Sequence, residues 1–253
     1  MFNKILSSIG IGAAKVDLVL QGNKYRAGEQ IEGCLKVQSG AVEQEVNRIY
    51  VQLVVQSKFK KDDDVKEVSK ELDHAVLSEG FTVTPDEQER EIPVSYILPE
   101  DIPISTGPTQ SFLATGMDIS RAVDPRDNDP VEILPGQRQQ IVMNALEKEL
   151  GFRKKRGTGA FNGQYQEFEY RPGKFLQGKL DELEVIYQVR EDGIALIMQI
   201  DKKSGGLLGG LLDELDMDER NAAFLLKNHQ ITTAGEVSEL LARFIQQEYQ
   251  KIM

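Results

Sequence analysis

Few side chains in this chain have the types and spacing that enzyme catalysis requires. There are two histidines, His74 and His229, and one cysteine, Cys34. Neither histidine accompanies a nucleophile or a metal-ligand spacing, because His74 lies in a charged segment and His229 in a predicted helix break. Cys34 falls on the outward face of a predicted strand with no histidine beside it, which indicates a structural thiol. We therefore expect no catalytic, cofactor-binding or metal-binding residues, and no enzymatic activity.

Three further segments resemble ligand-binding patterns, but each lacks a part that its pattern needs. Residues 60–64 include three successive aspartates, whereas calcium loops space their ligands at alternate positions and contain a glycine. Residues 153–156 form a basic patch that suits an acidic partner or a phosphate, but no aromatic residues are interleaved with it. Residues 204–212 are rich in glycine but lack the Gly-Lys-Ser/Thr ending of a phosphate loop. We therefore expect residues 60–64 to form a solvated hairpin tip, residues 153–156 a solvated strand end and residues 204–212 a flexible joint.

Composition and charge limit the surroundings in which the protein works. The chain has 253 residues, of which 40% are hydrophobic, and a net charge of -11. Such an acidic surface repels phosphate backbones, so we expect no nucleic-acid binding. No apolar run approaches the roughly 20 residues of a membrane helix, and residues 1–12 lack the features of a secretory signal, so we expect a cytoplasmic protein. Residues 1–12 could still form an amphipathic helix that touches a membrane, or a terminal helix packed on its own domain.

Alternating apolar and polar residues predict strands throughout the first half. In residues 25–37, one face of the predicted strand carries Ile31, Gly33 and Leu35. Gly28 stands where a tight turn needs positive φ, and Gly33 allows a close approach on the inward face. Further alternation predicts strands at residues 15–20, 49–56, 92–98 and 112–119. The strand at 49–56 is expected deep in a sheet. The strand at 92–98 is expected at an edge or bulge, because Pro93 lacks a backbone donor. Short strands separated by turns, without a helical period, favour an antiparallel sandwich.

The second half begins with one predicted helix and then returns to strands. Residues 143–151 indicate a short helix that ends at a C-cap glycine, Gly151. Residues 164–170, 183–189 and 194–200 alternate, and the Asp192-Gly193 pair between the last two is a strong hairpin signal. These strands predict a second antiparallel sandwich.

The C-terminal segment changes to a helical period. We predict a first helix at residues 218–227 and a second one after a capping box formed by Thr233 and Glu236. The second helix carries an apolar stripe that must be buried, either on the second sandwich, on a symmetric partner chain in a homodimer, or on a separate protein partner. We take the stripe as the candidate partner-binding site; its members are Val237, Leu240, Leu241, Phe244 and Ile245.

Taken together, these features resemble the arrestin fold. The pattern Tyr25-x-x-Gly28-Glu29-x-Ile31-x-Gly33-x-Leu35-x-Val37 is similar to the early strand pair of that fold, and the prolines at 93, 99 and 103 are spaced as in the passage that follows it. The start at residues 9–17, with residues 181–185 and 199–203, is similar to a narrower bacterial group, the sporulation-control family (SpoOM-type). This resemblance implies two arrestin-like sandwiches, no enzymatic activity, and a regulatory effect on the entry into sporulation.

These observations combine into one set of expectations. The fold class is all-β, with two tandem antiparallel β-sandwiches, residues 1–133 and 134–210, followed by a helical C-terminal segment, residues 211–253. We expect a non-enzymatic regulatory or scaffold protein that acts through protein–protein interaction in the control of sporulation onset, with protein partners and without cofactors. The alternative is a membrane-peripheral structural scaffold that uses residues 1–12 and 204–212. A carbohydrate-binding sandwich is less favoured, because such sites present exposed aromatics and this chain has no tryptophan.

Overall fold

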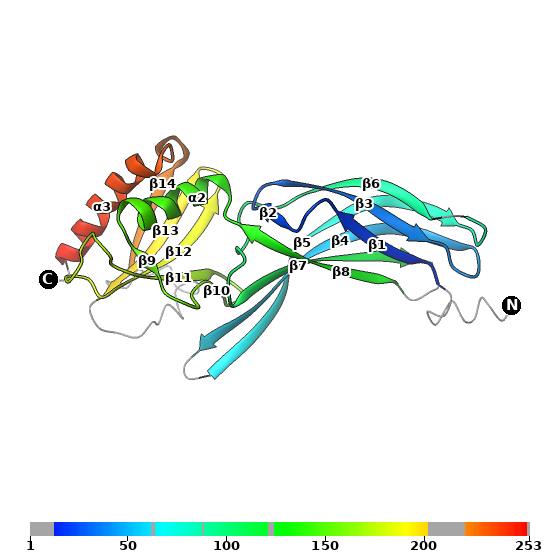
Figure 1. The fold of residues 1–253 in the computed structure, drawn as a ribbon, viewed down its shortest axis with the longest axis horizontal. Helices are drawn as coiled ribbons and strands as arrows, with labels where there is room; N and C mark the ends of the chain where they lie inside the picture. Colours follow the sequence, from blue (N-terminus) through cyan, green and yellow to red (C-terminus); the bar gives the residue numbers. More distant parts are fainter. Residues whose placement is uncertain (1–12, 62–63, 88, 121–123, 202–220, 252–253) are drawn as a thin grey trace. The chain divides into compact units, whose positions relative to one another are not determined.

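The computed structural model describes residues 13–61, 64–87, 89–120, 124–201 and 221–251, and the chain divides into two compact units (Figure 1). Unit 1 comprises Met1–Gln56, Ser69–Ile102 and Gln110–Leu134. Unit 2 comprises Ser57–Val68, Pro103–Thr109 and Pro135–Met253. Each unit is therefore built from several separate stretches of the chain.

Unit 1 contains two sheets. The smaller sheet is antiparallel in the order β1-β3-β6, and the larger has the order β2-β8-β7-β4-β5, in which β2 and β8 run parallel. The strands of the smaller sheet are β1 (Lys15–Leu20), β3 (Gln30–Gln38) and β6 (Arg90–Ile97). Those of the larger sheet are β2 (Lys24–Arg26), β8 (Arg126–Leu134), β7 (Thr109–Ile119), β4 (Gln44–Lys61) and β5 (Asp64–Val83), and the adjoining ends of β4, β5 and β7 belong to unit 2.

The core of unit 1 lies between the two sheets, as the alternation predicts. Ile49, Val51 and Leu53 of β4 have no exposed surface, and β4 lies inside its sheet, so the prediction of a deep strand is confirmed. Pro93 lies in β6 at the edge of the smaller sheet, where its missing donor costs no ladder bond, and that prediction is also confirmed.

Two aspartates link the strands at the edges of this sandwich. The backbone N–H of Leu18 in β1 donates to Asp127 Oδ2 of β8 at 3.2 Å. The Tyr96 hydroxyl of β6 donates to Asp73 Oδ2 of β5 at 2.7 Å. The second bond joins the edge strands β6 and β5, and the first joins the edge strand β1 to β8, which lies next to the edge strand β2. Polar contacts therefore close the apolar interior on both sides.

Two glycines in the predicted early motif have the roles expected of them. Gly28 has φ +83°, and its N–H donates to the carbonyl of Pro99 at 3.2 Å. At Gly33, a side chain would meet the carbonyl oxygen of Val19 at 3.1 Å. The turn and the close approach therefore both depend on the absence of a Cβ.

We expect the Gly28→Ala variant to lower the free energy of unfolding by about 1–2 kcal/mol, because an L-residue is strained at this positive φ. The added Cβ would also lie 2.8 Å from Glu100 Cγ, the middle of a flexible side chain. Chemical denaturation followed by circular dichroism measures the change. Gly107→Ala is the matched control, since a Cβ there meets nothing within 4 Å. Equal effects of the two substitutions would contradict the prediction.

Unit 2 contains one six-stranded sheet, in the order β10-β11-β12-β13-β14 with β9 paired to β11. Its strands are β9 (Arg153–Lys154), β10 (Ala160–Phe161), β11 (Gln166–Arg171), β12 (Glu182–Arg190), β13 (Gly193–Asp201) and β14 (Asn221–Lys227). Its described helices are α2 (Gln137–Asn144), the π-helix η1 (Ala145–Glu149) that continues it, the 3-10 turn η2 (Asn228–Gln230) and α3 (Ala234–Lys251). One cluster of buried side chains joins the inner face of the sheet to these helices; it includes Phe168, Val185, Leu196, Leu146, Leu241 and Ile245.

The predicted fold class is confirmed: antiparallel sheets dominate both units, and a helix ends the described chain. In the described part of unit 2, helices cover the inner face of the sheet, where unit 1 has a second sheet. The predicted helix at residues 218–227 is wrong, because residues 221–227 form β14 and pair with β13. The helix predicted at 143–151 begins earlier, at Gln137, and is followed by Gly151 with φ +74°.

A buried hydrogen-bond network attaches two outlying stretches to the sheet of unit 2. The Gln166 side chain donates to the carbonyls of Ile104 and Gly159, each at 2.8 Å, and accepts from the N–H of Ile104 at 2.9 Å. The N–H of Phe161 in β10 donates to the hydroxyls of Ser57 at 3.0 Å and Thr109 at 3.2 Å. Residues of Ser57–Val68 and Pro103–Thr109 are thus hydrogen-bonded to β10 and β11.

Candidate functional site

The outer face of the sheet in unit 2 carries a row of carboxylates, which we call the acidic face. Glu167 and Glu169 alternate along β11 with Phe168 and Tyr170 of the core, so the glutamates point away from the helices. On the adjacent strand β12, Glu184 lies directly opposite Glu169. The acidic face consists of Glu167, Glu169, Glu182 and Glu184, together with Lys155, which follows β9.

Lys155 is the cation that pairs with this row. Its ammonium contacts Glu169 and lies 2.5 Å from Glu182 Oε1. The two carboxylates that it bridges are partly exposed, at 34% and 32% of their side-chain surface. Behind them, Glu184 is only 6% exposed, and its Oε2 is buried without a hydrogen-bond partner. Carboxylates therefore outnumber cations on this face, and the most buried of them is not fully satisfied.

Burial and mutual repulsion change the acidity of two members of the row. Burial is the main cause that raises the pKa of Glu184 to about 7, and the other carboxylates of the acidic face add to it while Lys155 opposes it. Burial likewise raises the pKa of Glu167 to about 7, with Glu169 and Glu182 adding to the effect. Burial beside Glu167 also raises the pKa of Tyr165, whose phenol stays protonated. The acidic face therefore changes its charge near neutral pH.

This acidity predicts that the protein loses stability as the pH rises from about 4.5 to about 7, the interval between the ordinary and the raised pKa of these groups. The unfolded chain releases the protons of Glu167 and Glu184 near the ordinary pKa of 4.5, whereas the folded chain holds them until the raised pKa of about 7. The stabilisation is therefore complete below the ordinary pKa and is lost progressively as the pH rises to 7; because solvent screens these partly buried groups, the loss is on the order of 2 kcal/mol for each. Denaturant unfolding at several pH values measures it. We expect Glu184→Gln to flatten this dependence and the exposed control Glu45→Gln to leave it unchanged; the same pH profile in both variants would contradict the assignment.

A second acidic group lies in unit 1, where Asp127 closes the edge between β1 and β8. Burial, followed by the nearby charge of Asp127, raises the pKa of Asp129 to about 7. Burial and Asp127 also raise the pKa of Asp17. Because Asp127 accepts the N–H of Leu18, this group has a structural role at the edge of the sandwich.

Two tyrosines, the buried Tyr170 and the half-buried Tyr187, form a polar pair at the core of unit 2. The hydroxyls of Tyr170 and Tyr187 lie 2.8 Å apart, and Tyr170 also donates to Glu147 of η1 at 3.5 Å. Glu147 in turn pairs with Lys154 at 2.9 Å. Burial raises the pKa of both phenols, so they remain neutral. These groups satisfy one another, which indicates a structural role.

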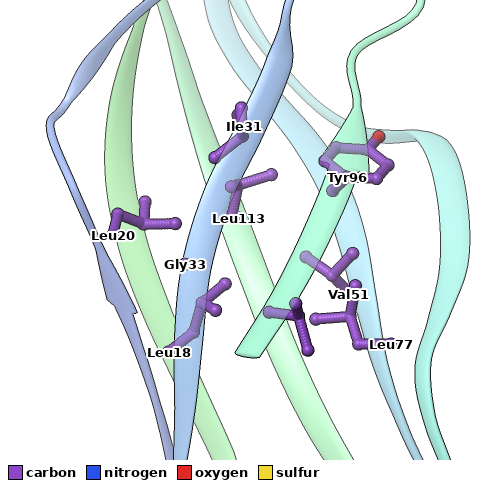
Figure 2. A pocket seen from close by; sticks show the side chains of 9 residues that line it. Leu18, Leu20, Ile31, Gly33, Val51, Leu77, Tyr96 and Leu113 are labelled. Carbon is purple, nitrogen blue, oxygen red and sulfur yellow. The ribbon is translucent and has the colours of Figure 1, made fainter. Parts of the chain in front are cut away.

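A small cavity lies between the sheets of unit 1 (Figure 2). Its lining is almost wholly apolar and includes Leu18, Ile31, Val51, Leu113 and the residue Gly33. Its volume of about 10 Å³ corresponds to one water-sized sphere, and an apolar space of that size stays empty. The cavity is a packing gap and is too small for an organic ligand.

The two histidines and the cysteine belong to three different elements, His74 to β5, His229 to η2 and Cys34 to β3. The His74 ring stacks on Tyr50 with 5.0 Å between centroids, and its Nδ1 lies 3.5 Å from Glu71. His229 is exposed in η2, and Cys34 is partly exposed in β3. Within the described ranges, no group of three or more His, Cys, Asp or Glu side chains is placed to hold a metal ion.

The basic patch predicted at residues 153–156 is divided between two surroundings. Lys154 pairs with Glu147 beside the core, whereas Lys155 pairs with the acidic face. Other predicted features lie outside the described residues: the aspartates at 62–63, the glycine-rich joint at 204–212 and the N-terminal residues 1–12. Among the helices that the structure does describe, none is long and apolar enough to cross a membrane.

The apolar stripe of the C-terminal helix packs within unit 2. Val237, Leu241 and Ile245 have no exposed surface and belong to its core. The other two residues of the stripe, Leu240 and Phe244, are partly buried against the same core. The ring of Phe244 stacks on that of Phe224 in β14, with 4.6 Å between the ring centroids. Binding of a partner through these five residues stays a prediction, and it would require α3 to leave the sheet.

Sequence reasoning missed the acidic face. Glu167 and Glu169, and likewise Glu182 and Glu184, are two residues apart in predicted strands, so each pair could be expected to share a face. In a chain with 41 acidic residues such pairs are common and carry little information. What distinguishes these four is the pairing of β11 with β12, which no local pattern specifies.

Comparison with known proteins links the chain to one family. A family model described as "SpoOM protein" matches residues 2–204. The sporulation-control protein spo0M of Bacillus subtilis strain 168 is 30% identical over 254 residues, which cover 97% of this chain and 98% of that protein. A crystal structure of Spo0M from Bacillus subtilis superposes with a TM-score of 0.79 at 29% identity, covering 94% of this chain and 100% of the other.

Proposed function

Because the chain belongs to the SpoOM protein family, we propose that it takes part in the control of sporulation and that it acts by binding other proteins, without catalysis. The observation that carries the first part is the extent of the match to the sporulation-control protein of Bacillus subtilis. The similarity covers 97% of this chain, so both units take part in it.

The distribution of polar groups supports the second part of the proposal. Outside the core of unit 2, the acidic face presents charged groups on the surface of a regular sheet. Strands β6 and β14 stand at sheet edges, where an extended segment of a partner could add by backbone pairing. Leu225 of β14 is 37% exposed, so this edge also offers apolar contact.

A complementation experiment tests the role in sporulation. The gene for this chain would be expressed in Bacillus subtilis from which its own spo0M has been removed, and heat-resistant spores would be counted after starvation. We expect the chain to shift the spore count of the deletion strain toward that of the parent strain. A count equal to that of the empty-vector control, with the protein present at normal level, would contradict the proposal.

Cross-linking tests the mode of action. The tagged full-length chain would be cross-linked in starving cells of the complemented strain, purified, and analysed by mass spectrometry. We expect specific proteins to be enriched above a control that expresses the tag alone. Spore complementation without any enriched protein would leave the role in sporulation standing and would contradict action through protein binding.

A further inference from the structure

The acidic face contains a buried carboxylate oxygen that has no hydrogen-bond partner. Buried polar atoms almost always have a hydrogen-bond partner, and a buried carboxylate without one is costly. Glu184 Oε2 is such an atom, and Glu184 is only 6% exposed. The groups around it repel a negative charge, because Glu167, Glu169 and Glu182 are all acidic. An added positive donor is the group that would satisfy this arrangement.

Lys155 shows how a cation is held at this place. Its single ammonium spans Glu169 of β11 and Glu182 of β12. It leaves Glu184, which lies directly opposite Glu169, without the hydrogen bond that its second oxygen requires. A planar guanidinium offers several N–H donors in a fixed fork and suits paired carboxylates better than a point charge does.

We propose that the acidic face is a binding site for a basic side chain, arginine or lysine, on a protein partner. This inference rests on the proposed function, and it adds the chemistry of the partner and the surface that recognises it. The rim is formed by Glu169 and Glu182, which are reachable from solvent, and the interior by Glu184 and Glu167. Lys155 holds the rim together in the free protein and shares it with the incoming cation.

Binding of a cation here is linked to protons. A basic group binds the ionised carboxylates, so it must compete with the protons that Glu167 and Glu184 hold. Affinity therefore rises with pH, by about tenfold between pH 6 and pH 8 for each group that ionises in that range. General attraction to the negative surface of the protein does not depend on Glu167 and Glu184 in particular.

The first test uses a defined probe with the full-length chain. A fluorescent peptide of alternating arginine and alanine would be titrated at pH 6, 7 and 8 at constant ionic strength, and its anisotropy measured. We expect the affinity to rise about tenfold or more over this range. Glu167→Gln with Glu184→Gln should weaken binding at pH 8 about tenfold and remove the pH dependence. Their melting temperatures would confirm that the variants are folded.

The matched control removes the same charge elsewhere. Glu43→Gln with Glu45→Gln changes two exposed carboxylates of unit 1 and should leave binding and its pH dependence intact. Equal losses in both double variants, or no pH dependence in the unmodified protein, would overturn the proposal, because the attraction would then be general. A peptide with glutamine in place of arginine should not bind.

The second test separates this inference from the proposed function. The cross-linking experiment in starving cells would be repeated with both double variants. If the Glu167/Glu184 variant alone loses a partner, the inference is supported. If it captures the same proteins in the same amounts as the unmodified chain, the inference fails while binding to proteins stands. If neither the unmodified chain nor any variant captures a protein, action through protein binding itself fails, and with it this inference.

Discussion

Leu241→Ala should lower the free energy of unfolding by about 2–5 kcal/mol, the range for removing a buried leucine from a packed core. Leu241 has no exposed surface and lies in the cluster that joins α3 to the sheet of unit 2. The truncation removes apolar contacts from both elements at once and leaves a cavity between them.

The matched control is the same substitution one residue earlier. Leu240 is only partly buried against the cluster, so Leu240→Ala should cost clearly less than Leu241→Ala. Denaturant unfolding followed by circular dichroism provides both values. If Leu241→Ala changed stability by no more than Leu240→Ala, then α3 would not be part of the core of unit 2, and its stripe would again be open to a partner.

Gln166→Leu should destabilise the protein by about 2–4 kcal/mol, although leucine has a similar size and is more apolar. The glutamine satisfies both the N–H and the carbonyl of Ile104, which is 4% exposed, and also the carbonyl of Gly159. Leucine fills the space but leaves these backbone groups buried and unpaired.

Gln164→Leu provides the comparison for this substitution. Gln164 is exposed, so its replacement should change the free energy of unfolding by no more than about 0.5 kcal/mol. Hydrogen exchange adds a local reading: in the Gln166→Leu variant, the amides of residues 103–109 should lose protection before those of β3 in unit 1. Uniform loss across both units would show that the network does not act locally.

Local patterns predicted most strands of this protein because each has one buried face. Ile49, Val51 and Leu53 alternate with less buried residues, and their strand lies where that pattern places it. The turn at Gly28 and the helix end at Gly151 were also predicted from the sequence, and both glycines have the positive φ that glycine permits. These predictions succeeded because periodicity and glycine report local geometry directly.

The errors arose where distant pairing decides the structure. The sequence Asn-Ala-Ala-Phe-Leu-Leu-Lys at 221–227 is apolar and short, so its period fits a helix as well as a strand. Pairing with β13, a strand already buried on its inner face, makes it β14. The acidic face depends in the same way on the register between β11 and β12, and its burial is a property of the assembled sheet.

The winding of the chain through both units has a consequence for how such a protein can be divided. Ser57–Val68 and Pro103–Thr109 belong to unit 2, yet the stretches flanking them belong to unit 1. A fragment that starts at residue 135 would lack the Ser57 and Thr109 hydroxyls and the Ile104 backbone that β10 and β11 bind. A single cut in the gene therefore cannot separate one unit from the other, and neither unit can be transferred to another protein as one continuous segment.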